Sequence, residues 1–175
     1  MFAYFYKDKS IKIFMYLTIA IDILLDFFLI SDKLIYIGRN KMAVGITFKN
    51  GKCVEAINYY CEVFDLDFPK NLIKYSDFDK FSLPDNMKDR IYNSYLDIFG
   101  NRIYFYDTTN DDSIEEGNNV RIVIETNSDN LYNTYMNFRK ESTVKRQPQR
   151  INKKLFTTLV DKYGITWQFI ANSEN

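Results

Sequence analysis

The stretch VDKYGITWQF, Val160 to Phe169, combines a turn with a strand close to the C-terminus. Gly164 is typical of a turn, and the residues that follow it alternate in character. The apolar residues at positions 165, 167 and 169 are expected to face a core, whereas Thr166 and Gln168 face the other side of the sheet. A neutral glutamine on the polar side of a closing strand is the first candidate for a binding residue.

A strand, a helix and further strands then occur twice in the chain. Residues 44–48 alternate as in a half-buried strand that ends at Asn50 and Gly51, and residues 120–125 alternate in the same way. The helix predicted at residues 52–64 should bury the face that carries Val54, Ile57, Cys61 and Phe64. In the second half, Ser128 is expected to cap a helix that buries Leu131, Tyr135 and Phe138.

Each half also ends in a hairpin whose turn carries an aromatic residue and a glycine, Phe99–Gly100 and Tyr163–Gly164. Aligning the two glycines pairs Tyr104 with Gln168, each four residues beyond its glycine. The repeated unit predicts an α+β fold in which two βαβββ modules form one curved mixed sheet with the helices on its outer face. Residues 65–87 are expected to be an irregular strand and a loop. The acidic residues 107–119 favour a solvated linker over a calcium loop, because they lack EF-hand spacing.

Three segments resemble, in order, those of the vicinal oxygen chelate superfamily, and of its PhnB-like branch in particular. They are EAINYYCEVF at 55–64, KDRIYNSYLDIFGNRIYFYD at 88–107 and VDKYGITWQF at 160–169. The resemblance covers residues 42–171 and implies a glyoxalase-like domain over that range. Members of this branch often carry a phenylalanine-tryptophan pair where this chain has Ile151 and Asn152. We therefore do not infer that this chain binds the ligand of the branch.

The resemblance also implies where a metal would bind. In metal-dependent members each module supplies one ligand near the start of its first strand and one on its last strand. The matching positions here are Gly45, Tyr104, Val120 or Arg121, and Gln168. They offer neither carboxylate nor imidazole, and the chain contains no histidine. We therefore expect no metal and no other cofactor.

The side of the sheet that faces away from the helices holds the candidate ligand-binding residues. By strand alternation they are Tyr95, Arg102, Tyr104, Tyr106, Arg121, Thr166 and Gln168. The tyrosines would supply apolar walls with hydroxyl groups, and an arginine would hold an anionic group. An ordinary hydrated sheet face is the alternative. The opposite side, with residues such as Leu96, Ile103, Phe105 and Trp167, is expected to form the core.

These observations favour a metal-free, PhnB-like protein that binds an unidentified small molecule as a homodimer, with no catalytic residue assigned. One alternative is a metal-dependent or metal-free lyase, isomerase or transferase of the same fold, with Tyr104 or a nearby carboxylate as acid or base. Cys53 and Cys61 are interpreted as buried thiols in a reducing cytoplasm. The formal net charge of zero gives no strong general attraction to nucleic acid, and no basic stripe is expected, so no nucleic-acid partner is predicted.

Residues 1–41 form a hydrophobic N-terminal extension with three open interpretations. Residues 11–30 are almost continuously apolar, as in a membrane or signal-anchor helix, but Asp22 and Asp26 oppose insertion. The residues GRNKM at 38–42 can be encoded by a ribosome-binding sequence before a start codon, which would make Met42 the start. The third interpretation is an amphipathic helix docked on the domain. A membrane partner, and a membrane-anchored form instead of a cytoplasmic protein, are expected only if this extension is genuine.

Overall fold

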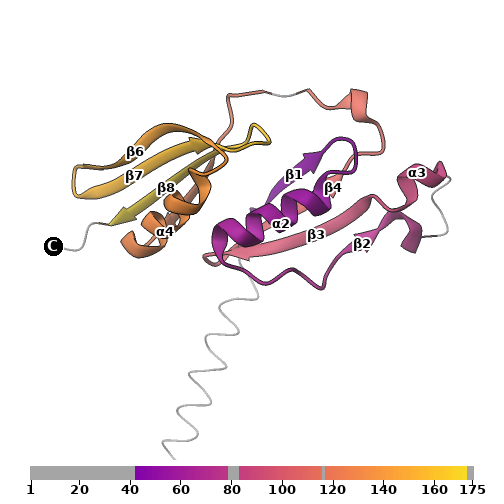
Figure 1. The fold of residues 1–175 in the computed structure, drawn as a ribbon, viewed down its shortest axis with the longest axis horizontal. Coiled ribbons are helices and arrows are strands. Elements are labelled where there is room, and N and C mark those ends of the chain that lie inside the picture. The colour runs from indigo at the N-terminus through magenta and orange to yellow at the C-terminus, as the bar shows by residue number, and fades with distance from the viewer. Residues whose placement is uncertain (1–41, 79–82, 116, 173–175) are drawn as a thin grey trace, which may run out of the picture. The chain divides into compact units, whose positions relative to one another are not determined.

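The computed structural model describes residues 42–78, 83–115 and 117–172, which form an α+β fold of two repeated modules (Figure 1). The N-terminal extension and its three interpretations lie outside the described residues. The domain boundary predicted at residue 42 falls at the edge of this range and stays a prediction. No helix within 42–78, 83–115 or 117–172 is long and apolar enough to span a bilayer.

The first module is a four-stranded mixed sheet covered by one helix. Its elements are β1 (Val44–Phe48), α2 (Cys53–Phe64), β2 (Ile73–Lys74), β3 (Ile91–Ile98) and β4 (Asn101–Asp107). The strand order is β1-β4-β3-β2, with β1 parallel to β4 and the other pairs antiparallel. Between these elements lie the short helices η1 (Tyr75–Asp77) and α3 (Asp85–Lys88), and η2 (Asp111–Ser113) follows β4. The predicted irregular segment at 65–87 is thus largely loop and short helices.

The second module repeats this plan. Its elements are β5 (Ile122–Thr126), α4 (Ser128–Phe138), β6 (Thr143–Ile151), β7 (Lys154–Val160) and β8 (Thr166–Asn172). The strand order is β5-β8-β7-β6, and β5 runs parallel to β8 as β1 does to β4. The predicted pair of βαβββ modules is confirmed, and each module forms a four-stranded sheet of its own.

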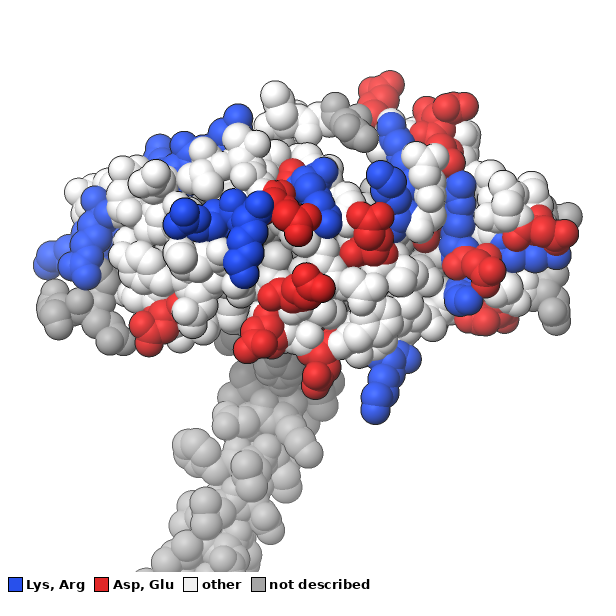
Figure 2. Space-filling view, in the orientation of Figure 1, with Lys and Arg blue, Asp and Glu red and all other residues white. Residues whose placement is uncertain are grey.

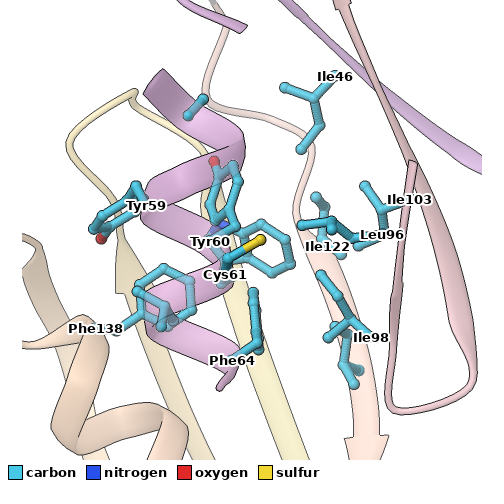
Figure 3. Packing of buried hydrophobic residues seen from close by; sticks show 14 of the residues in the cluster. Ile46, Tyr59, Tyr60, Cys61, Phe64, Leu96, Ile98, Ile103, Ile122 and Phe138 are labelled. Atoms are coloured by element: carbon cyan, nitrogen blue, oxygen red, sulfur yellow. The ribbon is translucent and has the colours of Figure 1, made fainter. Parts of the chain in front are cut away.

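The core lies between the sheets and the two helices, and it is shared by both modules (Figure 3). Trp167 of β8 is fully buried, and its ring centroid lies 5.4 Å from that of Tyr60 on α2. Phe64 of α2 packs edge-on against Phe138 of α4, with centroids 5.4 Å apart. Because helix α2 of one module contacts rings of the other, the large aromatic side chains join the two modules into one core.

Two predicted details of the helices are wrong. Val54 is 37% exposed, because the buried face of α2 is centred on Ile57 and Tyr60 and leaves Val54 on its margin. The N-cap of α4 is Asn127, whose side-chain oxygen accepts a hydrogen bond from the backbone N–H of Asn130 at 2.8 Å, while Ser128 is the first residue of the helix. The other residues predicted to be buried in the two helices are buried.

Candidate functional site

The predicted site residues of the first module form a tyrosine face on β3 and β4. Tyr95 and Tyr104 are cross-strand partners with ring centroids 5.8 Å apart, and Tyr104 stacks on Tyr106 at 6.3 Å. The guanidinium of Arg102 lies 3.9 Å from the centre of the Tyr95 ring. Asp97 holds this guanidinium in two hydrogen bonds of 2.9 Å. Arg102 is therefore already neutralised by a carboxylate, which weakens its predicted role as an anion-binding residue.

Tyr106 covers the adjacent strand β1. A Cβ atom added to Gly45 would lie 3.0 Å from Cε2 of the Tyr106 ring, so the ring occupies the space above this glycine. Burial raises the pKa of the Tyr106 hydroxyl, with a smaller effect from Tyr104. The first-strand position that the resemblance assigns to a metal ligand is therefore filled by an aromatic ring.

The predicted site residues of the second module line a groove of about 530 Å³. The groove lies on the side of the β5–β8 sheet opposite the core, since its residues alternate with the buried Leu159 and Trp167. The described residues that line it are Asn118, Arg121, Thr143, Lys145, Arg146, Thr158, Val160, Gly164, Thr166 and Gln168. Three of them are cationic, and none of these ten is acidic.

Arg121 and Gln168 contact each other directly. The Arg121 guanidinium donates a hydrogen bond to Oε1 of Gln168 over 3.2 Å, which links the start of β5 to the closing strand. Thr166, two residues earlier on β8, faces the same groove. The seven predicted site residues thus fall into two groups, a tyrosine face on β3–β4 and a polar groove on β5–β8. Among the contacts of the described residues, no hydrogen bond or ring contact joins the two groups.

The residues at the expected metal positions do not fit a divalent cation. Gly45 lies opposite Tyr104 in the β1–β4 register, and the residue opposite Gln168 in the β5–β8 register is Val123, not the predicted Val120 or Arg121. The four paired residues provide one phenol and one neutral amide, whereas protein sites for divalent cations are built around carboxylate, imidazole or thiolate ligands. Across 42–78, 83–115 and 117–172, no three His, Cys, Asp or Glu side chains are grouped closely enough to hold a metal ion.

The two cysteines lack the features of nucleophiles. Both are buried and unpaired. Burial raises the pKa of the Cys53 thiol, with a further contribution from Asp107, and burial likewise raises that of Cys61. A raised pKa leaves the thiol protonated, so these side chains act as small core residues.

The carboxylate of the VDKYGITWQF segment is structural. Asp161 is 5% exposed, and its Oδ2 accepts hydrogen bonds from the Tyr60 hydroxyl at 2.7 Å and from the Trp167 indole N–H at 2.8 Å. Its Oδ1 accepts from the backbone N–H groups of Tyr163 and Ile165, each at 2.9 Å. Burial raises the pKa of Asp161, while these hydrogen bonds act in the opposite direction. The segment thus forms a turn that the hydrogen bond between Asp161 and Tyr60 attaches to helix α2.

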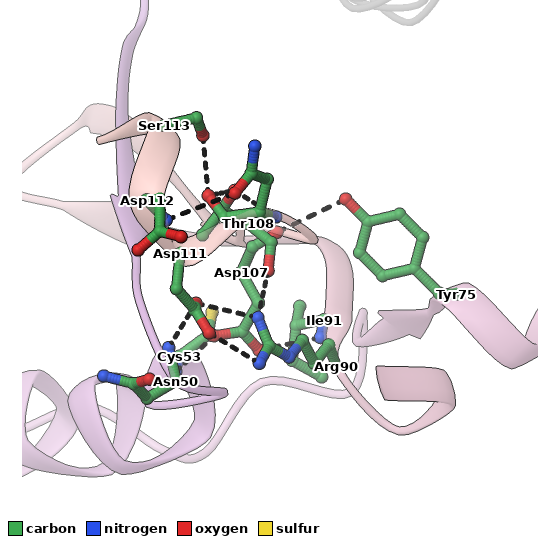
Figure 4. A network of polar contacts seen from close by, with 11 residues as sticks. Asn50, Cys53, Tyr75, Arg90, Ile91, Asp107, Thr108, Asp111, Asp112 and Ser113 are labelled. Atoms are coloured by element: carbon green, nitrogen blue, oxygen red, sulfur yellow. Dashed lines mark hydrogen bonds and ion pairs between the residues drawn. The ribbon is translucent and has the colours of Figure 1, made fainter. Parts of the chain in front are cut away.

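The acidic connector after β4 is anchored at its start (Figure 4). Asp107 is 2% exposed and accepts hydrogen bonds from the backbone N–H groups of Cys53 and Ile91, so it is part of the core and not of a solvated linker. Asp111 makes a two-pronged ion pair with Arg90, with both N–O distances 2.9 Å, and accepts from the Asn50 N–H at 2.7 Å. The predicted solvated linker is therefore wrong for these two aspartates.

Solved structures with the same arrangement identify the fold. Protein PA1353 from Pseudomonas aeruginosa matches with a TM-score of 0.59 and 17% identity, over 77% of this chain and 98% of that one. A PhnB protein from Bacillus cereus matches with a TM-score of 0.58 and 16% identity, over 75% of this chain and 99% of that one. The chain has the vicinal oxygen chelate fold. No protein-family model and no curated protein matches the sequence.

A third structure with the vicinal oxygen chelate fold contains a metal. It is a point mutant of the fosfomycin resistance protein FosX from Listeria monocytogenes, in complex with Mn(II) and 1S,2S-dihydroxypropylphosphonic acid. It matches with a TM-score of 0.51 and 14% identity, over 76% of this chain and 92% of that one. The present chain shares the fold with this metal-bound protein but lacks a group of metal-ligating side chains among its described residues.

Two cations of the groove, Lys145 and Arg146, were not predicted. A signal for them exists in the sequence, because residues 139–154 contain seven Lys or Arg and a single Glu, which the neutral net charge of the whole chain conceals. In Figure 2 the basic side chains over the β5–β8 module have few acidic neighbours, whereas those over the first module are interspersed with acidic side chains. The expectation that the chain has no basic stripe is therefore wrong for this segment.

Proposed function

We propose that this protein is a metal-free binding protein of the vicinal oxygen chelate fold that holds a small molecule in the groove of the β5–β8 sheet. The observation that carries the proposal is the groove itself, whose volume of about 530 Å³ lies in the range typical of small-molecule sites. Three residues predicted from the sequence, Arg121, Thr166 and Gln168, line it together.

Binding is favoured over catalysis by the chemistry of the groove. Its ten described lining residues include hydroxyl, amide and cationic groups, but no carboxylate, cysteine or tyrosine that could serve as acid, base or nucleophile. Tyr104, the acid or base considered in the alternative, lies in the other group of residues, on the tyrosine face. The homodimer and the cytoplasmic location stay predictions, which sedimentation and cell fractionation would test.

The proposal is tested by screening small molecules against isotopically labelled protein in the presence of a chelator. We expect ligands to shift the amide resonances of Thr166 and Gln168, because these residues line the groove. Thr166→Trp should fill the groove and abolish binding, whereas Thr47→Trp, on an exposed position of β1, should leave it intact. Stoichiometric metal in the purified protein, or binding that survives Thr166→Trp, would contradict the proposal.

A further inference from the structure

We propose that the ligand of the groove is a multiply charged anion, such as a phosphate ester or a polycarboxylate, held by Arg121, Lys145 and Arg146. This inference rests on the proposed binding function and specifies the class of ligand. Phosphate esters and polycarboxylates share two or more negative charges on a small molecule. Neither the fold nor the family resemblance assigns a ligand of this class to this groove.

The first argument is that the three cations have no acidic partner in the part of the chain that the structure describes. Arg121, Lys145 and Arg146 line one groove that has no acidic residue among its described lining. None of the three makes an ion pair with any carboxylate of residues 42–78, 83–115 or 117–172. Like charges held on one concave surface repel one another, and an anion bound between them removes that repulsion.

Arg102 on the tyrosine face shows the contrast. Asp97 engages two nitrogens of its guanidinium at 2.9 Å, so its charge is matched within the chain. The Arg121 guanidinium instead contacts the neutral Gln168 amide. That hydrogen bond orients the side chain without neutralising its charge, and no described carboxylate does so, which leaves Arg121 able to bind an anion.

The second argument is the distortion of β6. Neighbouring residues on a regular strand face opposite sides of the sheet, yet Lys145 and Arg146 both line the groove. The pairing of β6 with β7 shifts register between Val144 and Arg146 and again between Arg146 and Gln149. The buried Thr157 hydroxyl fixes the middle of this irregular segment by donating a hydrogen bond to the Arg146 carbonyl at 2.8 Å. The irregularity therefore places two consecutive cations on the same face, which is the usual effect of a β-bulge beside a binding site.

The third argument concerns the remaining groups of the groove. Thr143, Thr158 and Thr166 contribute hydroxyl groups that can donate hydrogen bonds to anionic oxygens. Further cations of the same hairpin, such as Arg150 and Lys154, extend the positive field around the groove and would steer anions toward it. The groove thus combines donors with unmatched positive charge, a set that suits a compact polyanion better than a neutral or singly charged molecule.

The experiment is calorimetric titration of the full-length protein with inorganic pyrophosphate, citrate and acetate at equal ionic strength. We expect pyrophosphate or citrate to bind in one-to-one stoichiometry and acetate to bind at least about tenfold more weakly, because it carries a single charge. Binding of pyrophosphate without citrate would assign phosphate esters, and the reverse would assign polycarboxylates. A 20-nucleotide single-stranded DNA tests whether the hairpin binds a polymer instead.

Two matched double variants locate the bound anion. Lys145→Gln/Arg146→Gln removes two charges inside the groove and should weaken pyrophosphate or citrate binding by about tenfold or more. Arg150→Gln/Lys154→Gln removes two charges from the same hairpin outside the groove and should change the affinity less than about threefold. Circular dichroism of both variants verifies that they fold.

The inference is overturned if acetate binds as tightly as the polyanions, if both double variants weaken binding equally, or if only the DNA binds. It is also overturned if a neutral compound shifts Thr166 and Gln168 while neither polyanion binds. In that last case the proposed function stands and only the ligand class fails. If no compound of any charge binds the groove, the proposed function itself has failed.

Discussion

The hairpin turns of the two modules carry the same spacing of an aspartate three residues before a glycine, yet they use that aspartate in opposite ways. The side chain of Asp97 is 53% exposed and pairs with Arg102 on the polar side of the sheet. Asp161 is 5% exposed and accepts four hydrogen bonds on the core side. The same local pattern therefore gives a surface ion pair in one module and a buried junction in the other.

Loop length explains this difference. In the first hairpin Ile98 pairs with Asn101, which leaves the two residues Phe99 and Gly100, both with positive φ, in the loop. In the second hairpin the Asp161 N–H donates to the Ile165 carbonyl, so the loop contains three residues and ends with Gly164 at φ 81°. In both hairpins the residue immediately before the loop, Ile98 or Asp161, faces the core. The additional loop residue makes the aspartate three positions before the glycine this last residue instead of the one before it, and side chains alternate along a strand, so the two aspartates face opposite sides.

Removal of the two carboxylates is the strongest test of this comparison. Asp161→Ala should lower the free energy of unfolding by about 3 kcal/mol or more, because it leaves the buried Tyr60 hydroxyl and Trp167 indole without an acceptor. The matched variant Asp97→Ala should leave the urea midpoint close to that of the unmodified protein, since exposed ion pairs contribute little. Equal losses in the two variants would show that the buried junction is not what sets Asp161 apart.

The two neighbouring tyrosines of α2 provide a smaller and sharper test. Tyr60→Phe should lower the free energy of unfolding by about 1–2 kcal/mol, because it removes the hydroxyl that donates to Asp161. Tyr59→Phe should not lower the free energy of unfolding, because the buried Tyr59 hydroxyl has no hydrogen-bond partner among the described residues. Urea denaturation of both variants measures the effect, and a larger loss for Tyr59→Phe would contradict the assigned hydrogen bond.

The pH dependence of stability gives the smallest expected effect. Burial raises the pKa of Asp161 in the folded protein above its ordinary value of about 3.9. The folded state then binds its proton more tightly than the unfolded state does. The stability from this group is therefore fully present below the ordinary pKa and is lost as the pH rises through the folded value.

Urea denaturation between pH 4 and pH 8 measures this dependence. Asp161→Asn should reduce the fall in stability with rising pH relative to the unmodified protein. Some fall should remain, because burial also raises the pKa of Asp107. The opposite result is that the difference in free energy of unfolding between the unmodified protein and Asp161→Asn grows as the pH rises. The four hydrogen bonds to the carboxylate would then have a larger effect than burial, and the pKa of Asp161 would be lowered.

The fold was predictable because it rests on periodicity. Alternating residues on the strands and the three- and four-residue spacing on the helices place Ile103, Phe105, Trp167 and Phe169 in the core, where they are found. The glycine alignment that pairs Tyr104 with Gln168 corresponds to equivalent positions in the two sheets, opposite Gly45 and Val123. The margin of α2 and the N-cap of α4 were less predictable, because a shift of one residue changes burial without changing the overall pattern.

The candidate site was predictable only in part. Regular alternation identified Arg121, Thr166 and Gln168, which share the groove. It could not identify Lys145 and Arg146 together, because their common orientation depends on a register shift against β7. The ion pair of Arg102 could not be predicted either, since the sequence does not show that Asp97 faces the same side and neutralises Arg102.

The sequence by itself determined the repeated modules and the composition of the core. It also determined that carboxylates and imidazoles are absent from the positions where the resemblance places metal ligands. These features follow from local spacing and residue type. The tertiary structure decided which carboxylates are buried, how the seven candidate residues divide into two groups, and which cations remain unneutralised. These features depend on loop length, strand register and contacts between residues far apart in the sequence, such as Tyr60 and Asp161, which are 101 positions apart. No local pattern contains that information.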